Sequence, residues 1–343
     1  MAGDTINAIE LKQLVKWNVI RLEEVIAIEG PSGCGKSEVI AQAVEEADAM
    51  LCDIRLGQYD SVDLRGIPDT NKKTGQTVWY PPSTMPFIGN DAFPDDKIIV
   101  IFLDELGSAT APVFGVCYQL LNEFRIGEHV LKPNVRIVCA LNRSSDRGIT
   151  NRMPFPLANR MTWFEMAVSV DAWCDWASRV GVPGVIIAFI RWKKLEALHT
   201  YNPDSPEKVV ATPRTWMKAV KYFMSDMPET LKRKSMNGAI GAGVATFFWG
   251  FHDTWSKVLP IKSIIKDPMG VELPTEESLI YATAVNVSTE ITTKNIGSLY
   301  RFLCRLKPEY AILAVQMAVA RDENLIDAPE YIDFSQRYRV VFQ

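Results

Sequence analysis

Short apolar runs alternate with helical patterns between residues 25 and 166. Each run has the length and the β-branched character of a buried strand. The runs are Val25–Glu29, Met50–Leu56, Lys97–Leu103, Val135–Leu141 and Met161–Met166. Between them, apolar residues keep helical spacing from Ile40 to Ala47 and again from Val113 to Phe124. This alternation predicts an α/β fold with a doubly wound parallel sheet.

The pattern changes on both sides of this region and once within it. Thr5–Leu22 carries the spacing of an amphipathic helix, which predicts an N-terminal helix within residues 1–22. After Val168 the strand signal fades, and helical spacing predicts an α-helical region over 168–343. Residues 57–96 are rich in Gly, Pro and polar side chains, and a turn before Thr77–Tyr80 predicts a hairpin inside this insertion.

Charge and composition narrow the possible partners. Lys and Arg total 37 against 41 Asp and Glu, so the chain lacks the basic excess that binding to a phosphate backbone usually requires. Nucleic acid is therefore not the expected partner. The six cysteines are scattered without metal-binding spacing, which favours free thiols in a reducing cytoplasm.

We expect no membrane association. The chain does not open with a basic and apolar secretion signal. Its most apolar stretch, Gly238–Phe251, falls short of the roughly 20 residues that span a bilayer and is expected to form a buried helix.

A glycine-rich segment lies between the first predicted strand and the first predicted helix. It fits the pattern GxxxxGK(S/T) and consists of Gly30, Pro31, Ser32, Gly33, Cys34, Gly35, Lys36 and Ser37. The glycines let successive backbone N–H groups point at one anion. Lys36 would add a mobile positive charge for phosphates, and the Ser37 hydroxyl could ligate Mg²⁺. The segment predicts a phosphate-binding loop, with Cys34 at a packing position.

The third apolar run ends in two carboxylates, Asp104 and Glu105. A buried strand that ends this way is typical of the Walker B pattern, in which Asp104 holds Mg²⁺ and Glu105 deprotonates the attacking water. The fourth run ends in Asn142, whose side chain could hold that water against the γ-phosphate. The segment after Asn142 lacks the Asn-Lys-x-Asp pattern of guanine readers, which favours ATP over GTP.

These motifs, together with several other stretches, resemble the AAA+ ATPases, and among them the MoxR-like group with an insertion in helix 2. The other stretches are Ser61–Gly66, Trp79–Pro82, Pro156–Arg160 and Ala211–Arg214, and their order follows that of the family. The resemblance implies a sheet in the order 5-1-4-3-2. It also implies an α/β nucleotide-binding domain over 23–167, a hairpin within 124–133, and a smaller α-helical lid domain after it.

The resemblance also implies roles for three polar residues. Asn142 would be sensor 1, Arg160 the arginine finger and Arg214 sensor 2. Thr212 and Pro213 are expected to begin the helix that carries Arg214, which could act on its own subunit's nucleotide or on a neighbour's. We expect Arg160 on the same sheet edge as Asn142 but pointing outward, with Arg147 and Arg152 as competing fingers.

Three classes of function are compatible with these motifs. The first is a MoxR-like ATPase that assembles as a ring, expected to be hexameric, and remodels a protein client, often in relatives with a partner that carries a von Willebrand factor A (VWA) domain. The second is an AAA+ motor or loader acting on nucleic acid. The third is a small-molecule P-loop kinase. ATP with Mg²⁺ is the expected ligand in each case.

Overall fold

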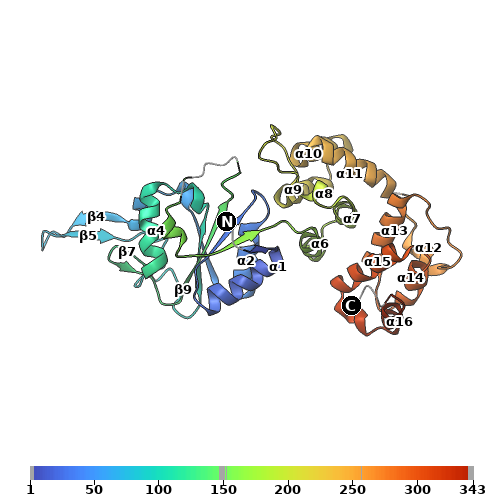
Figure 1. The fold of residues 1–343 in the computed structure, drawn as a ribbon, viewed down its shortest axis with the longest axis horizontal. Coiled ribbons are helices and arrows are strands. Elements are labelled where there is room, and N and C mark those ends of the chain that lie inside the picture. Colours follow the sequence, from blue (N-terminus) through green and yellow to red (C-terminus); the bar gives the residue numbers. More distant parts are fainter. Residues whose placement is uncertain (1–3, 147–150, 152, 256, 339–343) are drawn as a thin grey trace. The chain divides into compact units, whose positions relative to one another are not determined.

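The computed structural model describes residues 4–146, 151, 153–255 and 257–338. The chain divides into two compact units (Figure 1). Unit 1 comprises Met1–Ser169 with Tyr201–Ser205, and unit 2 comprises Val170–Thr200 with Pro206–Gln343.

Unit 1 is built on a six-stranded parallel sheet in the order β1-β10-β2-β9-β6-β3. Its strands are β1 (Thr5–Ile6), β2 (Ile26–Gly30), β3 (Met50–Arg55), β6 (Ile99–Asp104), β9 (Val135–Asn142) and β10 (Thr162–Met166). Numbered along the chain, the five predicted strands stand in the order 5-1-4-3-2. The α/β fold class and the strand order implied by the family resemblance are therefore confirmed.

Helices cover both faces of this sheet, because successive side chains in a strand point to opposite faces. The helical elements of unit 1 are α1 (Ala8–Leu14), the π-helix η1 (Val15–Arg21), α2 (Lys36–Glu46), the 3-10 turn η2 (Leu56–Gln58), α3 (Ser61–Arg65), the 3-10 turn η3 (Leu106–Ser108), α4 (Ala111–Glu123) and α5 (Phe155–Ala158). Val100 and Phe102 of β6 pack with α1 and α2, whereas Ile101 and Leu103 pack with α4.

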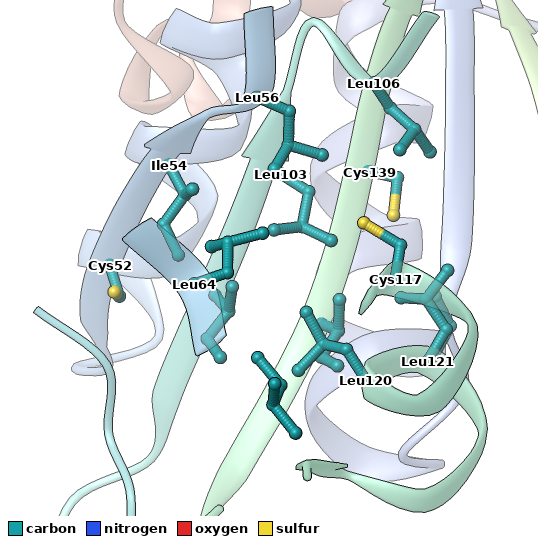
Figure 2. Close-up of a cluster of buried hydrophobic side chains, with 14 of the residues drawn as sticks. Cys52, Ile54, Leu56, Leu64, Leu103, Leu106, Cys117, Leu120, Leu121 and Cys139 are labelled. Carbon is teal, nitrogen blue, oxygen red and sulfur yellow. The ribbon is translucent and has the colours of Figure 1, made fainter. Parts of the chain in front are cut away.

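The core under α4 is shown in Figure 2. Leu103 and Cys139 of the sheet lie among Cys117 and Leu120 of α4, all fully buried. Burial raises the pKa of the Cys117 thiol to about 12, so it stays neutral at physiological pH. Leu56 and Leu106, also buried, anchor η2 and η3 at the end of the sheet where β3 and β6 finish.

The N-terminal segment differs from the predicted single helix. Thr5–Ile6 forms β1, which pairs with Glu165–Met166 of β10, and the helix begins only at Ala8 behind an Asn7 capping box. An edge strand of two residues is too short to show a period-2 pattern, so it could not be predicted from the sequence. Leu11 and Val19 belong to the core of unit 1, which makes this segment part of that unit.

Two antiparallel hairpins extend unit 1 beyond its sheet. The first consists of β4 (Ile67–Thr70) and β5 (Thr77–Tyr80), and the second of β7 (Arg125–Ile126) and β8 (His129–Val130). The first begins at Gly66, whose φ of 90° favours glycine and where a Cβ would lie 2.0 Å from the Tyr80 carbonyl oxygen. The Trp79 backbone N–H donates to Glu128 Oε1 at 3.2 Å, which joins the two hairpins.

In its described residues unit 2 is helical. Its helices are α6 (Val170–Arg179), α7 (Gly184–Lys193), α8 (Leu195–Leu198), α9 (Pro213–Met224), α10 (Glu229–Ile240), α11 (Ala242–Trp255), α12 (Ile261–Lys266), α13 (Glu277–Glu290), α14 (Ile296–Leu303), α15 (Pro308–Arg321), the 3-10 turn η4 (Glu323–Asp327) and α16 (Pro329–Arg337). Its core includes Phe189, Trp216 and Phe248, whose rings contact one another.

Two predictions for this unit can be compared with the structure. Thr212 caps α9 and Pro213 is its first residue, as predicted. The expected single buried helix over Gly238–Phe251 is wrong, because Gly241 adopts a φ of 86° and divides the stretch between α10 and α11. Among the described residues, no helix is both long and apolar enough to cross a membrane.

Candidate active site

The glycine-rich loop follows β2 at the end of the sheet to which parallel strands direct their carboxyl ends. Gly33 and Gly35 have φ values of 75° and 104°, a region that residues with a Cβ rarely adopt. Gly30 is required for space, since a Cβ there would lie 2.9 Å from the Met166 carbonyl oxygen. The loop then enters α2 at Lys36, so that backbone N–H groups at the helix N-terminus can face an anion.

Lys36 is buried against this loop and against the end of β9. Its Nζ donates to the Gly30 and Pro31 carbonyl oxygens at 2.7 and 3.1 Å and to Asn142 Oδ1 at 3.1 Å. The sheet register explains the last contact, because Gly30 pairs directly with Asn142. The structure therefore brings the predicted lysine and the predicted sensor together.

Ser37 and Asp104 form the next contact of the site. Ser37 Oγ, in the first turn of α2, donates to Asp104 Oδ2 at the end of β6 at 2.8 Å. Hydroxyl and carboxylate oxygens are hard ligands of the kind that Mg²⁺ prefers. These two side chains fit the expected magnesium ligands in chemistry and in proximity.

Glu105 lies directly after the strand in an uncommon backbone conformation. Its φ of 57° is in the left-handed region, where a non-glycine residue costs energy and where functional residues are often found. Its backbone N–H donates to Asp104 Oδ1 at 2.8 Å, which holds the Asp104 carboxylate against the backbone of Glu105. The Glu105 side chain is half-buried.

Cys34 packs inside the loop. Its Sγ lies 3.9 Å from Met166 Sδ and from Lys36 Nζ. Burial raises the pKa of the Cys34 thiol, and the nearby Lys36 charge offsets only part of this effect. A neutral, buried thiol is consistent with the packing position predicted for it.

Asp146 is a buried carboxylate at this site that sequence reasoning missed. Its Oδ2 accepts the Ser32 backbone N–H at 3.2 Å, and only 7% of the residue is exposed. Arg143, three residues earlier, forms an ion pair with Glu165 of β10 at 2.6 Å. Asp146 belongs to no recognised motif, and only its burial beside the loop reveals it.

Arg160 lies at the other edge of the sheet, so the expectation that it shares an edge with Asn142 is wrong. It comes just before β10, whose first residue pairs with Ile26 at the start of β2, whereas Asn142 pairs with Gly30 at the end. Four residues of strand separate the two edges by about 13 Å. The half-buried Arg160 donates to Pro156 O at 2.7 Å and to Asn122 Oδ1 at 3.2 Å, and it stacks over the ring of Tyr118.

The sequence predicts three further functional arginines, Arg147, Arg152 and Arg214. Arg214 lies in the first turn of α9 in unit 2, where it is exposed. Arg147 and Arg152, the competing fingers, lie outside the described residues.

Together these groups define what the carboxyl edge of the sheet can do. Backbone amides and the Lys36 ammonium can bind a polyphosphate, and the Ser37 and Asp104 oxygens can hold a divalent cation with it. A carboxylate next to them, that of Glu105, can accept a proton from water. This combination of groups is suited to phosphoanhydride hydrolysis.

Comparison with known proteins adds only weak similarities. No protein-family model and no curated protein matches the chain. Among solved structures, a candidate ATPase from Cytophaga hutchinsonii is 12% identical over 91% of this chain and 83% of its own, with a TM-score of 0.35. NtrX from Brucella abortus, in complex with ADP, is 15% identical over 97% and 67%, with a TM-score of 0.40. Hsp104 with ATPγS and FITC casein is 16% identical over 70% and 42%, with a TM-score of 0.35. Similarity at this level carries no functional argument.

Proposed function

We propose that this protein binds and hydrolyses ATP as a subunit of an AAA+ ring of the MoxR-like kind. The observation that carries the proposal is a pair of side-chain contacts. Lys36 meets Asn142 and Ser37 meets Asp104, across 106 and 67 residues of chain. Three segments predicted separately from the sequence thus meet at one edge of the sheet.

Each group would have a distinct part in hydrolysis. The loop amides and Lys36 bind the β- and γ-phosphates of ATP, and Ser37 with Asp104 would hold Mg²⁺. Bound Mg²⁺ supplies charge neutralisation on the phosphate oxygens. Glu105 takes the proton of the attacking water, while the Asn142 amide orients that water.

The position of Arg160 supports the proposed assembly. About 13 Å of strand separates it from the site of its own chain, too far for the same chain to use both. An adjacent subunit in a ring could instead receive Arg160 at its γ-phosphate, where a cation stabilises the transition state. We propose Arg160 as this finger and a hexamer as the ring. Arg214 is proposed as a second nucleotide-sensing arginine.

The two hairpins are proposed to contact a protein client. Ile67 and Tyr80, a cross-strand pair on the first hairpin, are 69% and 59% exposed, so together they offer apolar surface to a partner. Glu128 of the second hairpin holds the first through Trp79. By resemblance, a VWA-domain partner would present or receive the client.

The proposal is tested with Glu105→Gln. The amide has the shape of the carboxylate but is a far weaker base, so ATP binding should persist while steady-state turnover falls by about two orders of magnitude or more. Titration with a fluorescent ATP analogue and a phosphate-release assay measure the two effects. Hydrolysis at the unmodified rate would refute the assignment of the base.

The same variant tests assembly and partners. With ATP and Mg²⁺, trapped Glu105→Gln subunits should migrate as a ring in analytical ultracentrifugation and retain any VWA-domain partner in an affinity purification. A monomer at micromolar concentration under these conditions would contradict the ring.

A further inference from the structure

Gly57 lies beside the Glu105 carboxylate, with no room for a side chain between them. A Cβ at position 57 would lie 2.7 Å from Glu105 Oε2, 3.3 Å from Ser108 Cβ and 3.8 Å from Glu105 Cβ, and these are its three nearest atoms. A carbon and an oxygen without a bond between them normally stay beyond about 3.3 Å. Any side chain at position 57 would therefore collide with this carboxylate.

The backbone on both sides of this contact is held in place. Leu56 and Leu106, the neighbours of Gly57 and Glu105, are both buried in the core drawn in Figure 2. The Gly107 carbonyl oxygen accepts the Asn151 N–H at 2.8 Å, and Asp104 Oδ1 accepts the Glu105 N–H. The end of the Glu105 side chain is the part that can move.

Glycine is not required at position 57 by its backbone. Gly57 is absent from the glycines with positive φ, so alanine can adopt the same conformation. The position is also open to solvent, which leaves the displaced carboxylate room to turn away. The fold thus tolerates a methyl group at position 57, but the methyl group would displace the Glu105 carboxylate.

From these observations we infer that Gly57 is a positioning residue for hydrolysis, whose missing side chain leaves the Glu105 carboxylate in place to take the proton from water. This inference rests on the proposed function, because it requires Glu105 to be the base. A misplacement of about 1 Å in a catalytic group can cost about 100-fold in rate.

The test compares Gly57→Ala with Gly115→Ala. Gly115 is an exposed glycine of α4 whose added Cβ would meet nothing within 4 Å, so it controls for the loss of glycine. Gly57→Ala should lower kcat by about tenfold or more. It should leave the KM and Kd for ATP and the thermal midpoint near the values of the unmodified protein. Gly115→Ala should leave kcat, KM and Kd unchanged and raise the thermal midpoint slightly, because alanine is the better helix former.

A double-variant cycle with Glu105→Asp separates positioning from a general structural effect. Aspartate is one methylene shorter and withdraws its carboxylate from position 57, so Gly57→Ala should have little further effect on kcat in that background. An equal loss in both backgrounds, a parallel loss of ATP binding, or an unchanged kcat in Gly57→Ala would overturn the inference.

Glu105→Gln, measured alongside, distinguishes the two proposals. If Glu105→Gln is inactive and Gly57→Ala is fully active, the positioning role fails and the ATPase proposal stands. If Glu105→Gln is fully active, the proposed base itself is wrong.

Discussion

The two edges of the central sheet carry opposite halves of the proposed chemistry. At the carboxyl edge, Lys36 contacts Asn142, and Ser37 contacts Asp104. The side chains there that would touch ATP are partly or fully buried. At the amino edge, Arg136 is paired with Glu23 and Lys97 with Asp48. Arg160 differs from both, because its partners are neutral and, among the described residues, no carboxylate lies within ion-pair distance.

Under the proposed function, this difference would let a single sheet serve two active sites. A cation that is held in place by neutral groups keeps its full charge for an external anion, whereas Arg136 and Lys97 are already compensated. Parallel strands fix the separation of the edges, since every strand begins at one edge and ends at the other. The site of one chain would thus be completed by the other edge of a neighbour.

The largest effect is expected at the carboxyl edge from Lys36→Ala. It should weaken ATP binding by roughly 100-fold or more, since each hydrogen bond from a charged donor contributes about 1.5–3 kcal/mol. Calorimetric titration with ATP measures the loss. Lys72→Ala, which removes an exposed lysine from the turn of the first hairpin, is the matched control and should bind normally. Tight binding by Lys36→Ala would exclude this loop as the phosphate site.

Arg160→Ala should affect turnover but not affinity. ATP binding depends on the opposite edge, so Kd should stay nearly constant while kcat falls by at least about tenfold. Lys97→Ala, at the same edge but already paired, should keep the normal kcat. Phosphate release and nucleotide titration give the two numbers for each variant.

A mixture of Arg160→Ala and Lys36→Ala subunits tests whether Arg160 acts across a subunit boundary. Each variant alone should be nearly inactive. Co-assembled rings should regain hydrolysis wherever an intact loop faces an intact arginine. If co-assembled rings remain inactive, another arginine is the finger, and Arg152 is the next to test.

Asp146 should give a smaller effect, whose sign depends on the substitution. Asp146→Asn keeps an acceptor for the Ser32 N–H but removes a buried negative charge beside the phosphate-binding loop, so ATP affinity should rise a few-fold. Asp146→Ala removes the same charge but also leaves that N–H without its acceptor, and because this second effect costs about 1–3 kcal/mol and exceeds the first, affinity should fall. Equal affinities for both variants and the unmodified protein would show that the carboxylate does not act on the loop.

The smallest effect on basal turnover is expected from the first hairpin, which belongs to neither edge. Replacing Trp79 and Tyr80 with Ala should leave basal hydrolysis within about twofold of normal, as is usual for changes outside a site. It should, however, abolish stimulation by a client. Malachite-green assays with and without the client measure both. A collapse of basal hydrolysis would place the hairpin in the catalytic machinery.

The sequence by itself determined five of the six strands of the sheet and most of the residues at its carboxyl edge. Buried parallel strands read as continuous apolar runs, and each run ended close to the residue that the structure places at the edge, as with Asp104 and Asn142. Glycine patterning likewise marked the loop, because few other residues adopt the φ values found at Gly33 and Gly35. These signals are local, so one stretch of chain is enough to read them.

Only the tertiary structure decided which residues act together across long separations. The contacts of Arg160 with Asn122 and Tyr118 join residues 38 and 42 positions apart in the chain, and such contacts leave no trace in spacing. The hydrogen bond between Asp146 and Ser32 joins residues 114 positions apart in the chain. The space that Gly57 leaves for the Glu105 carboxylate depends on the absence of a side chain at position 57. Such relations depend on packing between distant segments, so no single segment of the sequence could have revealed them.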